Sequence, residues 1–314
     1  MSDPKSYPIN KYIADILWCI NSPTLIIHDH DFFSDQQQAA LFSEQVKFQI
    51  ENNYQKFIII LDKYLSNLKT KRLGDRFELF WLIAFEVHPG FQVVEHNLQL
   101  VQNKVTLGEL DLIVKDLIHD KYIHIELSCK YYLRVEQESN HVGRWIGPGK
   151  KDFLDRKLKK TFNKQLLLPK LDAAKSILNN KNLIVDDSKV IFRGRLFLPS
   201  SLTMASRKDI LESYRNRKTS EKQWLEGAYQ INENCNLGYW GTANCLKEFS
   251  RTNELDISEW HWLTKPDWFS DCVANPKKLT KLDVLYPIQL KHNRTEDFFF
   301  LVEKDWLDHK LLKR

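Results

Sequence analysis

Two acidic residues near the middle of the chain have the types and spacing that could hold a metal ion. The segment GELDLIVKDLIHDKYIHIELSCKYYL, which begins at Gly108, predicts strands over 105–115 and 122–133, joined by a polar turn. Such a hairpin brings Asp111 of the first strand towards Glu126 of the second. Hard divalent cations prefer carboxylate oxygens as ligands. The sequence therefore predicts a site for Mg²⁺ (or Mn²⁺) between these two strands.

Alternation of side chains along each strand places further polar groups beside this acidic pair. Successive side chains point to opposite faces of a strand, so Glu109 shares a face with Asp111. In the second strand, His124 and Ser128 share a face with Glu126, and aliphatic residues occupy the other face. Glu109 either extends the metal site or faces water at the strand end. His124 and Ser128 are candidates for hydrogen bonds that support the metal ligands.

A helix is predicted over 73–87, where apolar residues recur at helical spacing before Pro89 and Gly90 end the pattern. Its apolar face is expected to pack on the sheet. Glu78 falls within that face, where a carboxylate costs free energy unless it gains a partner. It is therefore either a member of the acidic site or an edge residue with a basic neighbour.

A basic segment follows at 150–164, where seven Lys and Arg against two Asp give a net charge of +5. The whole chain also carries +5, so its charge excess is local. Helical periodicity is predicted over 151–178, with a possible break at Pro169. A basic helix face is what phosphate binding requires, although it is also typical of a solvated helix. The candidate nucleic-acid-binding residues are Lys157, Lys160, Lys164 and Gln165.

The order of predicted elements indicates an α/β (α+β) fold with a mixed sheet. Residues 1–70 read as a helical N-terminal region that packs on a core at 71–200. That core has the order helix, three strands, helix, strand, in which 91–100 supplies the first strand and 190–199 the last. Residues 201–314 form a C-terminal α+β extension.

The C-terminal extension is rich in aromatic residues, with six of the nine tryptophans of the chain. A basic helix is predicted at 206–218, and strands are predicted around Trp240, Trp260 and Phe298–Val302. Exposed aromatic rings can stack on unpaired bases. Such residues more often belong to a core or an interface, and both interpretations stay open.

The Asp and Glu on neighbouring strands resemble the motif of the PD-(D/E)XK nuclease superfamily, including its Holliday-junction-resolvase-like members. The chain more closely resembles a bacterial family within that superfamily, domain-of-unknown-function family 1853. This second resemblance extends over most of the chain in separated patches. They lie at 17–18, 22–23, 73–74, 77–78, ELSCKYYL at 126–133, WIGP at 145–148, 157–158, 165–166 and 197–199.

The resemblance implies a restriction-endonuclease-like core and a Mg²⁺-dependent nuclease that hydrolyses phosphodiester bonds of DNA. It implies a catalytic site of Glu78, Asp111, Glu126 and Lys130, in which the three carboxylates hold the metal. Superfamily members often place an acidic residue on the first core helix, which favours Glu78. The alternatives are a catalytically inactive nuclease-fold protein that binds nucleic acid or a protein partner, and a structural role in which the acidic face pairs with the basic helix.

The chain departs from the superfamily motif at the lysine. The usual motif has Lys two residues after the Glu, but that position is Ser128 here, and the lysine arrives at Lys130. Four residues of strand span about 13 Å, against about 7 Å for the usual spacing. The resemblance to family 1853 favours Lys130, because Glu with Lys four residues later is that family's pattern. Lys157 on the basic helix is the rival for the lysine's role.

Composition excludes several other classes of protein. With 28% charged and 43% hydrophobic residues, the 314-residue chain is typical of globular proteins. No apolar run is long enough for a membrane span, and no secretory leader is visible. Five scattered cysteines without a CxxC pair predict reduced thiols and a cytoplasmic location. The motifs of P-loop NTPases, dinucleotide-binding folds, zinc peptidases and serine hydrolases are absent. No feature indicates an oligomeric state.

Overall fold

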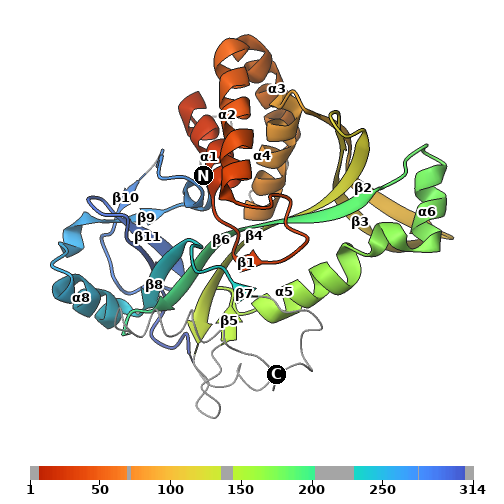
Figure 1. Ribbon diagram of the computed structural model, residues 1–314. Coiled ribbons are helices and arrows are strands. Elements are labelled where there is room, and N and C mark those ends of the chain that lie inside the picture. The colour runs from red at the N-terminus through yellow and green to blue at the C-terminus, as the bar shows by residue number, and fades with distance from the viewer. Residues whose placement is uncertain (1–6, 69–71, 136–143, 202–229, 275, 308–314) are drawn as a thin grey trace. The chain divides into compact units, whose positions relative to one another are not determined.

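Helices at the N-terminus precede a mixed β-sheet in the computed structural model (Figure 1). Ten strands of the described residues belong to this sheet, so the protein is a mixed α/β protein as expected. No helix within the described part of the chain is long and apolar enough to cross a membrane. The structure describes residues 7–68, 72–135, 144–201, 230–274 and 276–307.

The chain divides into two compact units that alternate along the sequence. Unit 1 comprises Met1–Cys129 and Leu158–Arg193, and unit 2 comprises Lys130–Lys157 and Gly194–Arg314. Two long strands and one helix therefore begin in one unit and end in the other. The three consecutive regions expected from the sequence stay a prediction.

Four helices form the first part of unit 1. They are α1 (Ile9–Asn21), α2 (Gln36–Asn52), α3 (Tyr54–Asn67) and α4 (Leu73–Val87). The start of α2 is fixed by Asp35, whose side chain accepts a hydrogen bond from the backbone N–H of Gln38 at 2.8 Å. Aromatic rings pack between α2 and α4. The ring centroid of Phe42 lies 6.1 Å from that of Trp81 and 5.4 Å from that of Phe85. Helix α4 has the predicted bounds.

The strands that follow form an antiparallel hairpin sheet in unit 1. In this sheet β2 (Phe91–Gln102) pairs with β3 (Val105–Asp116), which pairs with β4 (Lys121–Val135). These strands confirm the three predicted from the sequence. The polar turn between β3 and β4 contains Asp120 at a φ of 51°, a conformation that Asp tolerates better than most residues. Strand β6 (Asp187–Pro199) confirms the fourth.

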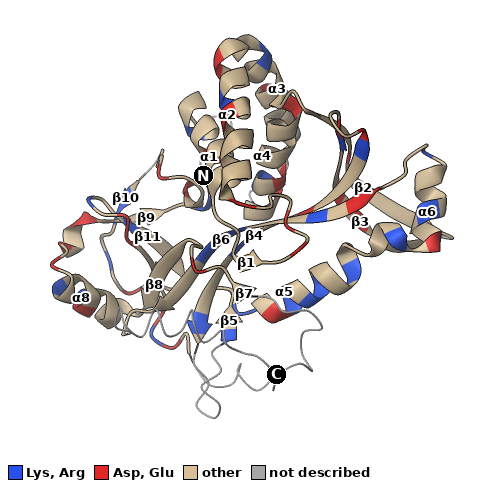
Figure 2. Cartoon of the chain, viewed as in Figure 1, with Lys and Arg blue, Asp and Glu red and all other residues tan. Residues whose placement is uncertain are grey.

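The basic segment is less regular than a single helix. It consists of α5 (Leu154–Lys160), a π-helical turn η2 (Thr161–Gln165), a 3₁₀ turn η3 (Leu168–Lys170) and α6 (Asp172–Asn179). Pro169 lies in η3, which confirms the predicted break, but the π turn was not expected. Lys and Arg recur along α5 (Figure 2).

The turn η3 packs closely on β3 in unit 1. A Cβ atom on Gly108 would lie 2.6 Å from Cδ2 of Leu168, so glycine is what allows this approach. Leu168 belongs to a buried cluster with Leu110 and Ile113 of β3 and Leu178 of α6. The apolar face of the segment therefore fixes its path along the strand that carries Asp111.

The described part of unit 2 contains short strands and the ten-residue helix α8 (Ala243–Thr252). Strand β8 (Leu237–Gly241) is parallel to β6 and β12 (Phe298–Leu301), and β11 (Ile288–His292) is antiparallel to β12 and β9 (Trp260–Leu263). Of these, β8, β9 and β12 confirm the aromatic strands expected here, and β11 was not expected. Smaller elements are β5 (Arg144–Ile146), β7 (Gln230–Ile231), β10 (Lys277–Lys278), η4 (Ile257–Glu259) and η5 (Lys265–Trp268).

Aromatic residues of unit 2 build a core between these strands and α8 (Ala243–Thr252). Phe249 of α8, Trp260 of β9 and Phe299 of β12 are buried together in it. Trp260 and Trp240 therefore have core positions, one of the two interpretations left open by the sequence. The basic helix predicted at 206–218 and Trp224 lie outside the described residues.

Candidate functional site

Asp111 and Glu126 lie where β3 and β4 stop pairing. The last residues in register are Leu112 and Ile125, and the next step along the two strands is Asp111 opposite Glu126. The side chain of Asp111 reaches across this gap, because its Oδ2 accepts a hydrogen bond from the backbone N–H of Leu127 at 2.9 Å. The structure thus brings together the two carboxylates that the sequence placed on neighbouring strands.

Glu126 is buried, with 1% of its side chain exposed, and its carboxylate is held by a histidine. His124 Nε2 lies 3.1 Å from Glu126 Oε1, and His124 Nδ1 lies 3.4 Å from Ser188 Oγ of β6. Burial lowers the pKa of His124 to about 4, despite the nearby charge of Asp111. The imidazole is therefore neutral at pH 7 and has a single N–H to donate.

Glu78 on α4 joins the same group of charges, because α4 packs on β3. Its pKa is raised to about 8, first by burial and then by four neighbouring carboxylates, Asp111, Asp75, Glu109 and Glu126. We call these five residues the acidic cluster. At neutral pH the cluster keeps a proton on Glu78, which lowers the repulsion among its charges.

The acidic cluster fits a magnesium ion by its donor chemistry. Among the residues that the structure describes, no group of three or more His, Cys, Asp or Glu side chains is arranged to hold a metal ion. However, Mg²⁺ is usually bound through one or two carboxylates, and waters and substrate phosphates complete its coordination. Asp111 and Glu126 supply two carboxylates. The raised pKa of Glu78 reflects burial first and then the neighbouring negative charges, which a cation would offset.

The predicted nucleic-acid-binding residues separate into exposed and half-buried ones. Lys160 and Lys164 are exposed, while Lys157 and Gln165 are half-buried. The hydroxyl of Thr161 donates to Gln165 Oε1 at 3.2 Å, so these two residues share one face. The turn that carries Thr161 and Gln165 contacts β3 in unit 1. Lys157 belongs to unit 2.

Lys130 lies in unit 2, where it forms an ion pair. Its Nζ donates to Oδ2 of Asp152 at 2.6 Å, and both side chains are partly exposed. Strand β6 passes close by, because Gly194 has a φ of 138° and a Cβ there would lie 1.8 Å from the carbonyl oxygen of Lys130. The choice between Lys130 and Lys157 as the site lysine stays a prediction.

Sequence reasoning missed the supporting residues that come from other strands and loops. Ser188 lies 64 residues from His124, and no local pattern links them. Asp31 is another such residue: burial raises its pKa to about 6, while the charge of the buried Arg193 opposes this rise. The signal in the sequence was Arg193 itself, a charged residue inside the apolar strand 190–199, which suggests that it has a buried acidic partner.

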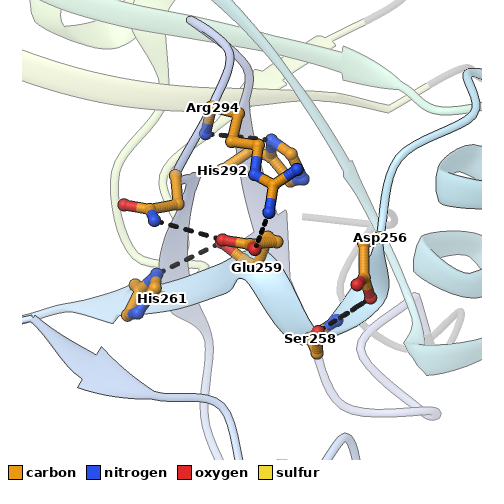
Figure 3. Close-up of polar contacts among 7 residues, drawn as sticks. Asp256, Ser258, Glu259, His261, His292 and Arg294 are labelled. Carbon is orange, nitrogen blue, oxygen red and sulfur yellow. Dashed lines mark hydrogen bonds and ion pairs between the residues drawn. The ribbon is translucent and has the colours of Figure 1, made fainter.

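Unit 2 contains a second group of charged side chains around Glu259 (Figure 3). Glu259 accepts hydrogen bonds from Asn293 Nδ2 at 3.1 Å and from an Arg294 guanidinium N–H at 2.8 Å. His261 Nδ1 donates to the backbone carbonyl of Glu259 at 3.1 Å. The hydrogen bond from Asn293, followed by the charge of Arg294, lowers the pKa of Glu259. We call these four residues the Glu259 cluster, and its contacts tie the β11–β12 turn to η4.

Comparison with known proteins places the chain in a family. The model of the domain of unknown function DUF1853 matches residues 14–305, so the chain belongs to this family. No curated protein and no solved structure matches the chain.

Proposed function

We propose that the protein is a Mg²⁺-dependent nuclease with a restriction-endonuclease-like core of the PD-(D/E)XK type, which hydrolyses phosphodiester bonds of DNA. The observation that carries this proposal is the position of Asp111 and Glu126 at the point where β3 and β4 separate. There Asp111 accepts a hydrogen bond from the backbone N–H of Leu127, which holds its carboxylate beside the strand that carries Glu126. Glu78 adds a third carboxylate within their electrostatic reach.

Asp111 and Glu126 are the residues that would hold the ion, and Glu78 would complete its surroundings. A bound divalent ion supplies Lewis-acid chemistry at the scissile phosphate. Glu78 holds a proton at neutral pH in the surroundings described, and positive charge beside it favours release of that proton. Lys160 and Lys164 are exposed cations that would contact the phosphate backbone of the DNA.

Lys130 is assigned the role of the motif lysine, which steadies the attacking water or the phosphate. Its ion pair with Asp152 must open for this role, at a modest cost, because both groups are partly exposed. The same ion pair favours a second candidate function, a nuclease-fold protein that binds nucleic acid or a protein partner without cutting. In that case Lys130 has a structural partner and no substrate.

Cleavage assays separate the two functions. Supercoiled plasmid and labelled oligonucleotides are incubated with wild type and with Asp111→Asn, in Mg²⁺, Mn²⁺ or EDTA. Metal-dependent cleavage by wild type that Asp111→Asn loses supports the nuclease. DNA binding by wild type without cleavage in either metal supports the second function. Cleavage that Asp111→Asn retains would show that the active site lies elsewhere. Asp256→Asn, in an exposed turn of unit 2, is the matched control.

A further inference from the structure

His124 is a fully buried histidine whose two ring nitrogens both have polar partners in unit 1. Its exposed fraction is 0%, and it precedes Glu126 by two residues on the same strand. The distances are 3.1 Å from Nε2 to Glu126 Oε1 and 3.4 Å from Nδ1 to Ser188 Oγ. An apolar residue of similar size would fill the same space, so packing alone does not require a histidine at this position.

The partners of the ring determine which nitrogen carries the hydrogen. A carboxylate that binds a divalent cation only accepts hydrogen bonds, so in the proposed metal-bound state Nε2–H is the donor to Glu126. The Nδ1 lone pair then accepts from the hydroxyl of Ser188, which is able to donate. Ser188 is itself fixed, because its N–H donates to Asp187 Oδ1 at 2.8 Å and its carbonyl accepts from His30 Nδ1 at 3.3 Å. The imidazole is thus held from β6 and presents its N–H to Glu126.

We propose that His124 is a positioning residue, which orients the Glu126 carboxylate for a divalent cation through its Nε2–H. Ser188 is part of the same device, since its hydroxyl selects the tautomer with hydrogen on Nε2. The inference rests on the proposed metal site, and it adds a residue that touches neither the ion nor the substrate. Hydrogen-bonded partners of this kind typically change metal affinity by about 10- to 100-fold when they are removed.

The test uses two replacements of His124 that differ in their ability to donate. His124→Gln keeps an amide N–H₂ at the reach of Nε2, whereas His124→Leu fills similar space without a donor. Mn²⁺ affinity of the full chain is measured by titration calorimetry at pH 7.5. We expect His124→Leu to bind Mn²⁺ about 10- to 100-fold more weakly. His124→Gln is expected to stay within a few-fold of wild type, since its amide restores the donor.

Further variants keep the proposal falsifiable if His124→Leu does not fold. Ser188→Ala leaves the imidazole in place but removes the group that selects its tautomer, so its Mn²⁺ affinity should fall between those of wild type and His124→Leu. In a Glu126→Gln background, adding His124→Gln or Ser188→Ala should change the residual Mn²⁺ affinity little, because the group they act through is gone. Thermal melting without metal verifies that each variant is folded.

The outcomes distinguish this inference from the proposed function. Equal Mn²⁺ affinity for wild type, Ser188→Ala and His124→Leu would overturn the positioning role and leave the metal site intact. Equal losses in His124→Gln and His124→Leu would also overturn it, because packing and not the N–H would then matter. If wild type binds Mn²⁺ with the expected dependence on His124 but never cleaves DNA, the positioning role holds and the nuclease proposal fails. No Mn²⁺ binding by wild type would overturn both.

Discussion

Glu78 in unit 1 and Glu259 in unit 2 are both carboxylates among other charged groups, yet their pKa values move in opposite directions. The pKa of Glu78 is raised to about 8, first by its partial burial and then by four neighbouring carboxylates. The pKa of Glu259 is lowered, because Asn293 and Arg294 donate hydrogen bonds to it. The two clusters therefore differ in the charges around the carboxylate: Glu78 lies among other carboxylates, whereas Glu259 lies beside a cation and an amide donor.

That difference separates a structural group from a candidate site. The contacts of the Glu259 cluster lie within the chain and fasten a turn, which is sufficient reason for its charges (Figure 3). The acidic cluster concentrates like charges at the end of a strand ladder and keeps a proton to reduce their repulsion. Surroundings that destabilise the charged form of a group are typical of functional sites, and a bound cation would stabilise that form. The comparison predicts that added cations act on unit 1.

The largest expected effect follows from removing a strand carboxylate. Asp111→Ala should lower Mn²⁺ affinity and metal-dependent cleavage by roughly 100-fold or more, since one of two carboxylate ligands is lost. Glu259→Gln should leave both unchanged, because its carboxylate already has partners within the protein. Calorimetry and a plasmid cleavage assay measure the two quantities. Equal losses in both variants would erase the distinction between the clusters.

DNA binding should depend on the basic segment and not on lysines of unit 2 in general. For duplex DNA, the logarithm of affinity falls with the logarithm of salt concentration by about 0.9 per phosphate contact. The triple change of Lys157, Lys160 and Lys164 to Gln should therefore make this slope shallower by roughly 2 to 3. Fluorescence anisotropy between 50 and about 200 mM salt measures it.

The matched control is a triple change to Gln of three exposed lysines of unit 2, Lys247, Lys278 and Lys281. It removes the same charge and should leave the salt slope as in wild type. An equal change of slope in both triple variants would indicate that DNA affinity depends on the net charge of the protein and not on the basic segment. A slope unaffected by either would favour the interpretation of the basic segment as a solvated helix.

The sequence predicted the strand elements well because their patterns are local. Alternating residues with a polar turn gave β3 and β4 within a few residues, and helical spacing before Pro89 gave the bounds of α4. The opposition of Asp111 and Glu126 also followed, since hairpin register is set by the length of the turn. These features depend on contacts between residues that are close in sequence.

Other features depend on long-range packing and could not be predicted in this way. The face of β4 that carries His124, Glu126 and Ser128 looks polar in sequence but is buried, which requires knowledge of the neighbouring strands. The π turn at 161–165 adds a residue to one helical turn, so the face predicted for Lys157 and Lys164 loses its simple spacing. Ser188 reaches His124 from another strand.

Neutralising Glu78 should stabilise the protein at alkaline pH. A carboxyl whose pKa is raised in the folded state gives stability that is present below its unfolded pKa near 4.5 and is lost as pH rises through about 8. Glu78→Gln removes this dependence. Because Glu78 is partly exposed, we expect it to gain only roughly 1 to 2 kcal/mol over wild type at pH 8.5. Urea unfolding without metal, between about pH 5 and about pH 8.5, measures the free energy of unfolding of both proteins. The upper pH is close to the raised pKa of Glu78. A loss of stability at pH 8.5 would mean that Glu78 is ionised and paired.

The smallest expected effect on stability is that of Glu259→Gln, and its sign is opposite to that of Glu78→Gln. A carboxyl whose pKa is lowered gives stability that is present above its unfolded pKa and is lost as pH falls through its folded pKa. Glu259→Gln should therefore lower the melting temperature slightly at pH 7, and the difference from wild type should shrink as the pH falls below about 4.5, the ordinary pKa of Glu. Glu254→Gln, an exposed carboxylate of the same unit, is the control and should change little. If Glu259→Gln instead raised the melting temperature at pH 7, as Glu78→Gln is expected to do at alkaline pH, the hydrogen bonds from Asn293 and Arg294 would not compensate its charge. The Glu259 cluster would then need an external cation as well, and the contrast between the two units would fail.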